Sequence, residues 1–189
     1  NVGSQRAIAI GIKYLNKFYN KKIKTIIIDS DGQDNPDIIV KLINLSNISP
    51  QNSIAVKRGQ RKEPFWFKIF YELYCLLIII FSYKKIRFGN FSLLNFVDLK
   101  KVSTQNELWS AYPPTISNNV TNLTFINADR EKRFGGKSKM NFFGLIFHAL
   151  KVFSVLKERI FFISSFYCLV SYFLLFDNYN LYFIFLSFF

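Results

Sequence analysis

Cysteine and histidine are scarce in this chain of 189 residues, which contains two cysteines and a single histidine. Both cysteines, Cys75 and Cys168, lie inside apolar runs, so the sequence offers neither a disulfide framework nor the Cys/His cluster of a structural zinc site. Acidic residues are also few, with 12 Asp and Glu against 25 Lys and Arg, and the net charge is +13. Because half of the residues are apolar, intrinsic disorder is excluded.

The positive charge is concentrated before residue 142. Residues 142–189 carry three basic and two acidic side chains, so the remaining charge of +12 belongs to residues 1–141. Residues 160–176 are uncharged and apolar, and as a helix they would extend about 26 Å across a hydrocarbon core of about 30 Å. We therefore predict a transmembrane helix here, a polar turn at residues 177–180 and a second apolar segment after it. Two such segments indicate a multi-pass membrane protein. The positive-inside rule then predicts that residues 1–141 lie in the cytoplasm.

Before residue 60 the pattern alternates between helix and strand. Apolar residues recur at helical spacing over residues 7–15, and the run KTIIID at residues 24–29 is typical of a strand buried on both faces in a parallel sheet. Pro36 favours the first turn of a helix over residues 36–45, and a strand is predicted over residues 53–56. This order predicts an α/β domain that is incomplete at its N-terminus, because no strand precedes the first helix.

An acidic segment, DSDGQD at residues 29–34, follows the first predicted strand. The carboxyl edge of a parallel sheet is where α/β folds bind ligands, and in an extended chain Asp29 and Asp31 point to the same side. Two carboxylates suit Mg²⁺ or Mn²⁺, which proteins hold with one or two carboxylates plus substrate phosphates. Taken alone, the Asp-x-Asp spacing favours a plain turn, because Asp, Ser and Gly are turn formers.

Five segments of the chain resemble, in the same order, segments of one enzyme family. DSDGQDNP at residues 29–36 resembles the metal-binding segment of family 2 glycosyltransferases with a GT-A fold, and NVGSQRAIAIG at residues 1–11 resembles the helix before it. VKRGQR at residues 56–61 is similar to the basic loop of that family, and FGNFSLL at residues 88–94 is similar to its Gly-x-Phe-x-Leu acceptor segment. RFGGKSK at residues 133–139 matches its Arg-x-x-Gly-x-Ser-Lys loop.

That last loop, followed by membrane helices, resembles polyprenyl-phosphate glycosyltransferases of the dolichyl-phosphate mannose synthase type. The resemblance implies a partial, Rossmann-like GT-A domain over residues 1–141. Residues 142–189 would then form an interfacial helix and transmembrane segments. The implied reaction is metal-dependent transfer of a sugar, with inversion, from a nucleotide-sugar donor to a polyprenyl phosphate such as dolichyl or undecaprenyl phosphate.

The resemblance also implies roles for individual residues. Asp29 and Asp31 would hold Mg²⁺ or Mn²⁺, with Asp31 also catalytic, and Gln33 and Asp34 would contact the donor. Arginine pairs bidentately with phosphate oxygens, and a Ser-Lys pair adds a hydroxyl and a point charge. The side chains expected to bind the acceptor phosphate are Arg58, Arg61, Arg133, Ser138 and Lys139.

Asn90 departs from the family, whose members often have aspartate at this position. We predict that Asn90 is catalytic through a hydrogen bond to an acceptor or sugar oxygen. A phosphate monoester, with a second pKa of about 6, is largely deprotonated at neutral pH and needs little help from a base. The asparagine therefore favours a lipid-phosphate acceptor over a sugar hydroxyl.

Two more stretches, residues 65–81 and 141–158, place their polar residues at helical spacing and leave wide apolar faces. Such helices lie in the lipid interface or pack in a core, and with cationic segments beside them we predict the interface, with membrane lipid as a partner. The basic residues are dispersed rather than gathered on one reading element, so no nucleic-acid partner is predicted.

Two other functions remain open. Processive polysaccharide synthases of the same fold resemble one another in a Gln-x-x-Arg-Trp motif, whereas residues 105–109 of this chain, QNELW, have Leu108 in the arginine position. A non-enzymatic, membrane-anchored protein that binds anionic lipid would account for the positive charge but not for the acidic segment.

Overall fold

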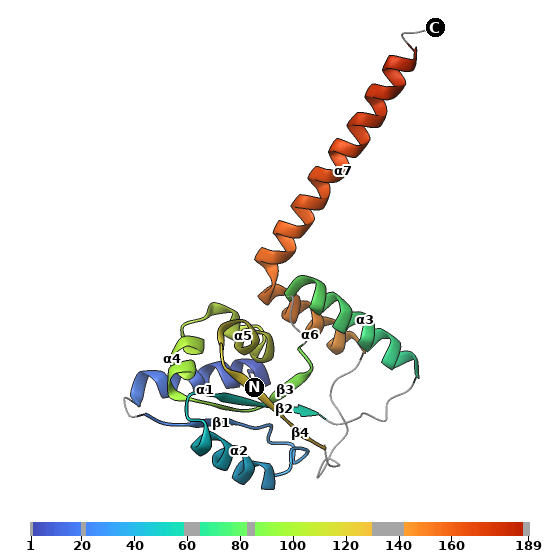
Figure 1. Ribbon diagram of the computed structural model, residues 1–189. Coiled ribbons are helices and arrows are strands. Elements are labelled where there is room, and N and C mark those ends of the chain that lie inside the picture. The colour runs from blue at the N-terminus through green and yellow to red at the C-terminus, as the bar shows by residue number, and fades with distance from the viewer. Residues whose placement is uncertain (1, 20–21, 59–64, 83–85, 130–141, 187–189) are drawn as a thin grey trace. The chain divides into compact units, whose positions relative to one another are not determined.

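A four-stranded mixed sheet forms the centre of the first part of the chain (Figure 1). The computed structural model describes residues 2–19, 22–58, 65–82, 86–129 and 142–186. The strands are β1 (Thr25–Ile27), β2 (Ser53–Arg58), β3 (Phe88–Leu94) and β4 (Leu123–Ala128), and their order in the sheet is β1-β3-β2-β4. β3 is antiparallel to β1 and β2, whereas β4 is parallel to β2. β1, β2 and β4 therefore run in one direction, and their carboxyl ends lie at one edge of the sheet.

The predicted α/β class is confirmed, but the parallel surroundings predicted for the first strand are wrong. β1 has β3 as its antiparallel neighbour and lies at the edge of the sheet that the described strands form. Only Ile27 of its three residues is buried. A run of β-branched residues predicts a strand but contains no information about its partner, which here follows about 60 residues later in the chain.

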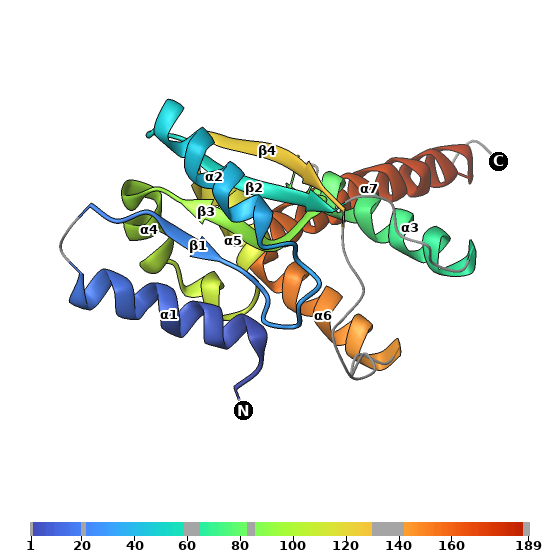
Figure 2. The same cartoon turned by 90° about the horizontal axis from the view of Figure 1, so that it is seen from below.

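Helices cover both faces of this sheet. Those of the first part of the chain are α1 (Ser4–Phe18), α2 (Asp37–Ile48), α3 (Phe65–Ser82), α4 (Phe96–Ser103), the short 3₁₀ helix η1 (Asn106–Trp109), α5 (Tyr112–Asn119) and α6 (Phe142–Val155). Figure 1 shows α1 on one side of the strands and α2 on the other, and Figure 2, seen from below, shows α2 lying across the strands. Successive residues of a strand point to opposite faces. Accordingly, Leu94 packs under α1, α4 and α5, whereas Leu93 packs with Leu42 of α2.

The start of α4 is attached to β2 through buried polar groups. Asn95 is the N-cap, and its Oδ1 accepts a hydrogen bond from the Asp98 backbone N–H at 2.8 Å. The Asp98 carboxylate in turn accepts from Ser53 Oγ at 2.6 Å and from Asn95 Nδ2 at 2.7 Å. Because buried polar groups are costly when they lack partners, this network determines where α4 begins relative to the sheet.

Two compact units make up the chain, Asn1–Val155 and Leu156–Phe189. In the second unit α7 (Lys157–Leu186) is continuous, so the turn predicted at residues 177–180 is wrong. Those four residues include neither Gly nor Pro, and Asp or Asn inside a helix costs less than about 0.7 kcal/mol each. Among the residues that the structure describes, no helix combines the length and the apolar character needed to cross a bilayer. The transmembrane segment and the domain boundary at residue 141 stay predictions.

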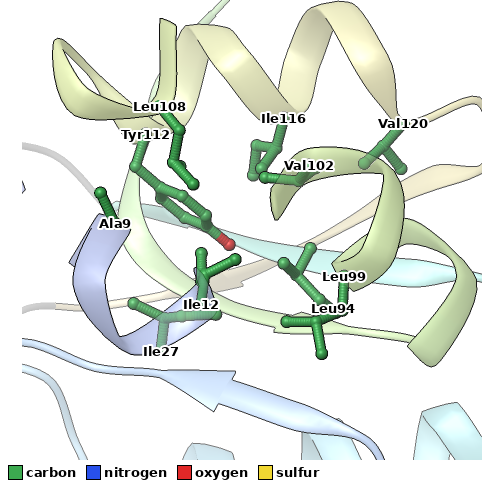
Figure 3. Close-up of a cluster of buried hydrophobic side chains, with 10 residues drawn as sticks. All are labelled: Ala9, Ile12, Ile27, Leu94, Leu99, Val102, Leu108, Tyr112, Ile116 and Val120. Carbon is green, nitrogen blue, oxygen red and sulfur yellow. The ribbon is translucent and has the colours of Figure 1, made fainter. Parts of the chain in front are cut away.

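The larger of two buried apolar clusters lies between the sheet and helices α1, α4 and α5 (Figure 3). Figure 3 shows the Tyr112 ring pointing into this cluster from the start of α5. The buried members are Ala9, Ile12, Ile27, Leu94, Leu99, Val102, Leu108, Tyr112, Ile116 and Val120. Ile27, two residues before the acidic segment, belongs to this cluster, so the end of β1 is anchored in the buried core.

Truncating a side chain in this cluster tests the packing. We expect Leu94→Ala to lower the free energy of unfolding by about 2–5 kcal/mol, because it removes buried methyl groups and leaves a cavity. The matched control is Val97→Ala on α4, where 73% of the side chain is exposed, and we expect a change of less than about 0.5 kcal/mol. Urea denaturation measures both, and equal losses in the two variants would contradict the described core.

Candidate functional site

The pairing of β1 with β3 decides which residue faces the acidic segment. Ile27 is paired with Ser92, and the same antiparallel register, continued by two residues, sets Asp29 opposite Asn90. Asn90 Nδ2 donates a hydrogen bond to Asp29 Oδ1 at 2.9 Å. Two residues assigned to one site by resemblance, and separated by 61 positions in the sequence, therefore meet at this edge of the sheet.

The acidic segment itself is a turn. β1 ends at Ile27, and Asp31 Oδ1 accepts a hydrogen bond from the Gln33 backbone N–H at 3.1 Å. Gly32 has a φ of 73°, which glycine adopts without steric cost. The extended geometry expected for Asp29 and Asp31 is therefore wrong, because the Asp31 side chain stabilises a local turn of the kind that Asp favours.

Exposure differs along this turn. Asp29, Asp31 and Gln33 are half-buried, whereas Asp34 is only 8% exposed. Among the described residues, no group of three or more His, Cys, Asp or Glu side chains is placed to hold a metal ion. Asp29 and Asp31 nevertheless supply the one or two carboxylates with which proteins hold Mg²⁺ when substrate phosphates complete its ligands. Asp29 and Asp31 therefore fit Mg²⁺ or Mn²⁺ when substrate phosphates complete the ligands.

Asn90 is held by partners on two sides. It is 8% exposed, its Nδ2 donates to Asp29, and its Oδ1 accepts from Gln5 Nε2 at 3.1 Å. Gln5 Oε1 in turn accepts from the Tyr112 backbone N–H at 2.7 Å. Neither Gln5 nor Tyr112 was among the site residues predicted from the sequence. The signal that points to them is the Tyr-Pro-Pro start of α5, which leaves one backbone N–H in need of an acceptor.

A second connection joins Tyr112 to the Asn90 backbone. The Tyr112 hydroxyl and Ser92 Oγ are 2.6 Å apart, and Ser92 Oγ donates to the Asn90 carbonyl oxygen at 2.9 Å. Because the Ser92 hydrogen is used in that bond, the Tyr112 hydroxyl is the donor to Ser92. Burial raises the pKa of the Tyr112 phenol, which opposes loss of the proton that it donates, although the hydrogen bond with Ser92 lowers that pKa by a smaller amount.

Of the residues predicted to bind the acceptor phosphate, the structure describes one. Arg58 ends β2 and is paired with Ala128 at the end of β4. Since β1, β2 and β4 run in the same direction, Arg58 lies at the same edge of the sheet as the acidic segment. The other four, Arg61, Arg133, Ser138 and Lys139, lie outside the described residues.

The position of Leu108 counts against a processive synthase as the alternative function. Leu108 is fully buried and belongs to the apolar cluster around Tyr112. In this chain the position that corresponds to the arginine of the Gln-x-x-Arg-Trp motif is therefore a core position. Burying an unpaired arginine there would be strongly unfavourable.

The chain matches no known family model, and no curated protein matches it at a significant level.

Replacing Asn90 by aspartate tests the contact with Asp29. We expect Asn90→Asp to lower the free energy of unfolding by about 1–3 kcal/mol in the presence of EDTA, because a carboxylate would replace the N–H that Asp29 accepts. The control is Asn44→Asp at an exposed position of α2, where we expect little change. The measurement is chemical denaturation, and an Asn90→Asp midpoint equal to that of the wild type would contradict the contact.

Proposed function

We propose that this protein is a membrane-associated glycosyltransferase that moves a sugar, with inversion, from a nucleotide-sugar to a polyprenyl phosphate. The observation that carries this proposal is the 2.9 Å hydrogen bond between Asn90 and Asp29. The resemblance assigns the segments around these residues to the donor and acceptor parts of one site. A chance likeness of two short segments gives no reason for them to be adjacent in space.

In this proposal Asp29 and Asp31 hold Mg²⁺ or Mn²⁺ together with phosphate oxygens of the donor. When bound, the ion neutralises the negative charge that develops on the departing nucleoside diphosphate. Gln33 and Asp34, on the same turn, are proposed to contact the donor. The hydrogen bond from Asn90 orients the Asp29 carboxylate before any substrate arrives.

Asn90 is an amide, so it has no proton-accepting group with a useful pKa. This supports an acceptor whose oxygen is already deprotonated, as the oxygens of a phosphate monoester are at neutral pH. That oxygen forms the new bond to the anomeric carbon while the bond to the nucleoside diphosphate breaks. Arg58 lies at the edge of the sheet where this acceptor is proposed to bind, and Arg61, Arg133, Ser138 and Lys139 are proposed to complete the phosphate site.

Two apolar helices support membrane lipid as a partner. Both predicted amphipathic stretches are helical, as α3 and α6, and they contact one another where the ring of Phe153 packs edge-on against Tyr74 and Phe81. Large apolar side chains remain exposed on both, namely Ile69, Leu73, Leu76, Ile79 and Ile80 of α3 and Ile146, Phe147 and Leu150 of α6. Helices with such faces, in a protein of net charge +13, suit an anionic membrane surface.

The direct test uses the full-length protein in detergent with polyprenyl phosphate, Mg²⁺ or Mn²⁺, and a panel of radiolabelled nucleotide-sugars. We expect metal-dependent label in the lipid fraction with at least one donor. We expect Asp31→Asn to reduce this transfer by at least about 100-fold, since the ion that Asp31 is proposed to hold would supply several kcal/mol of charge stabilisation in the transition state.

Asp37→Asn serves as the matched control, because Asp37 is an exposed carboxylate in the first turn of α2. We expect its transfer rate to stay within about twofold of the wild type, as is typical of exposed surface positions. Label in a polymer would favour the processive synthase instead. Absence of transfer with every donor, despite binding to anionic vesicles, would favour the non-enzymatic lipid-binding protein.

A further inference from the structure

The first backbone N–H of helix α5, that of Tyr112, needs a hydrogen-bond acceptor from outside the helix. The first backbone N–H groups of a helix have no partner within it, and Pro113 and Pro114 have no N–H at all. Tyr112 therefore contributes the only such N–H among the first three residues of α5. The N-cap residue, Ala111, has no side chain that can accept it. Gln5 of α1 fills this role across 107 positions of sequence, with its Oε1 at 2.7 Å.

The direction of each later hydrogen bond in this series follows from which atoms can donate and which can only accept. A backbone N–H only donates, so the atom of Gln5 that faces Tyr112 is the carbonyl oxygen. The Gln5 amide nitrogen then faces Asn90, which must present its own oxygen, at 3.1 Å. The Asn90 nitrogen is thereby turned toward Asp29 Oδ1, at 2.9 Å. We call this series, Tyr112 N–H to Gln5 to Asn90 to Asp29, the amide chain.

The origin of the amide chain is fixed by buried packing. Tyr112 is fully buried in the apolar cluster of Figure 3, and its hydroxyl leads through Ser92 to the Asn90 carbonyl oxygen. The Tyr112 backbone N–H therefore leads through Gln5 to the Asn90 side chain, and the Tyr112 hydroxyl leads through Ser92 to the Asn90 backbone. A side chain held in this way has a single favourable amide orientation, because flipping it would place oxygen against oxygen at Asp29 and nitrogen against nitrogen at Gln5.

We propose that Gln5 is a positioning residue, which acts through Asn90 to hold the Asp29 carboxylate in the orientation that receives a divalent ion. The ion-binding part of this inference rests on the proposed function. The amide chain itself is a property of the fold. Hydrogen-bond partners of metal ligands contribute about 10- to 100-fold to metal affinity, so a defect in Gln5 should be visible in ion binding, without turnover, when nucleoside diphosphates are present to complete the ligands.

The first variant is Gln5→Glu, which keeps size and shape but removes the donor. The new carboxylate can still accept from the Tyr112 N–H, yet it has no N–H to offer Asn90. Asn90 must then turn its nitrogen toward this carboxylate and its oxygen toward Asp29, where two acceptors meet. We expect a lower thermal midpoint for the full chain in detergent. In the presence of a panel of nucleoside diphosphates, we expect Mn²⁺ binding, followed by electron paramagnetic resonance, to be weakened by about 10- to 100-fold.

The decisive measurement adds Asp29→Asn. In the double variant the amide chain can run in reverse, because the new amide at position 29 donates to the Asn90 oxygen and the Asn90 nitrogen donates to the new carboxylate at position 5. We expect Asp29→Asn to raise the thermal midpoint of Gln5→Glu while leaving unchanged or lowering that of the wild type. Asp29→Asn would then raise the thermal midpoint in the Gln5→Glu background but not in the wild type. Residues 5 and 29 are each bonded to Asn90, so we expect this dependence to be transmitted through Asn90.

Gln105→Glu is the matched control, because the Gln105 side chain is bonded at the end of α4 and outside the amide chain. We expect its effect and that of Asp29→Asn to add. Repeating the cycle in 1 M KCl, where the Debye length is about 3 Å, separates hydrogen-bond coupling from repulsion between charges. Coupling between residues 5 and 29 should persist there.

Additive effects at residues 5 and 29, coupling that disappears in 1 M KCl, or Mn²⁺ binding by Gln5→Glu equal to the wild type would each overturn the proposal. If Gln5→Glu alone does not fold, a folded double variant supports the amide chain and an unfolded one overturns it. A wild-type protein that binds no Mn²⁺ with any of these diphosphates but shows the coupling would overturn the ion-binding role, and would count against the metal site of the proposed function rather than against the amide chain.

Discussion

The register between β1 and β3 is the constraint on which the candidate site depends. Ile27 lies opposite Ser92, and a shift of one residue would move every side chain of β1 to the other face of the sheet. In the observed register the turn that follows β1 faces the first half of β3, so Asp29 and Asn90 are within hydrogen-bond distance. The alternation of Leu93 and Leu94 between two apolar clusters holds β3 against such a shift.

Tyr112 links the buried packing to the polar site. Tyr112 contributes its ring to the apolar cluster, its backbone N–H to Gln5 and its hydroxyl to Ser92. Charged groups at a sheet edge usually depend on flexible side chains for their orientation. Here the orientation of Asp29 is connected to the buried apolar cluster that contains Tyr112, so the site is organised by the same packing that stabilises the fold.

The proposed reaction accounts for features that a lipid-binding protein leaves unexplained. A basic protein of this charge needs no acidic turn at the carboxyl edge of its sheet and no buried amide to orient a carboxylate. Transfer to a phosphate acceptor uses both, because the donor brings a diphosphate whose charge must be neutralised and the acceptor brings an oxygen that needs no base. The exposed apolar faces of α3 and α6 suit an acceptor that is itself embedded in lipid.

The sequence by itself determined the local features of this protein. The β-branched run at residues 24–29, Pro36 and the apolar periodicity of residues 65–81 predicted β1, α2 and α3, because strand, helix start and amphipathic helix each depend on neighbours within a few residues. The polar turn predicted at residues 177–180 was wrong because α7 continues through residues that only mildly disfavour helix. Only the tertiary structure decided that β1 lies antiparallel to β3 at the edge of the sheet that the described strands form, that Asp29 faces Asn90, and that Gln5 is bonded to both Asn90 and Tyr112. These contacts join residues 61, 85 and 107 positions apart, and such pairings are selected by the burial of the whole domain, about which no short stretch of sequence contains enough information.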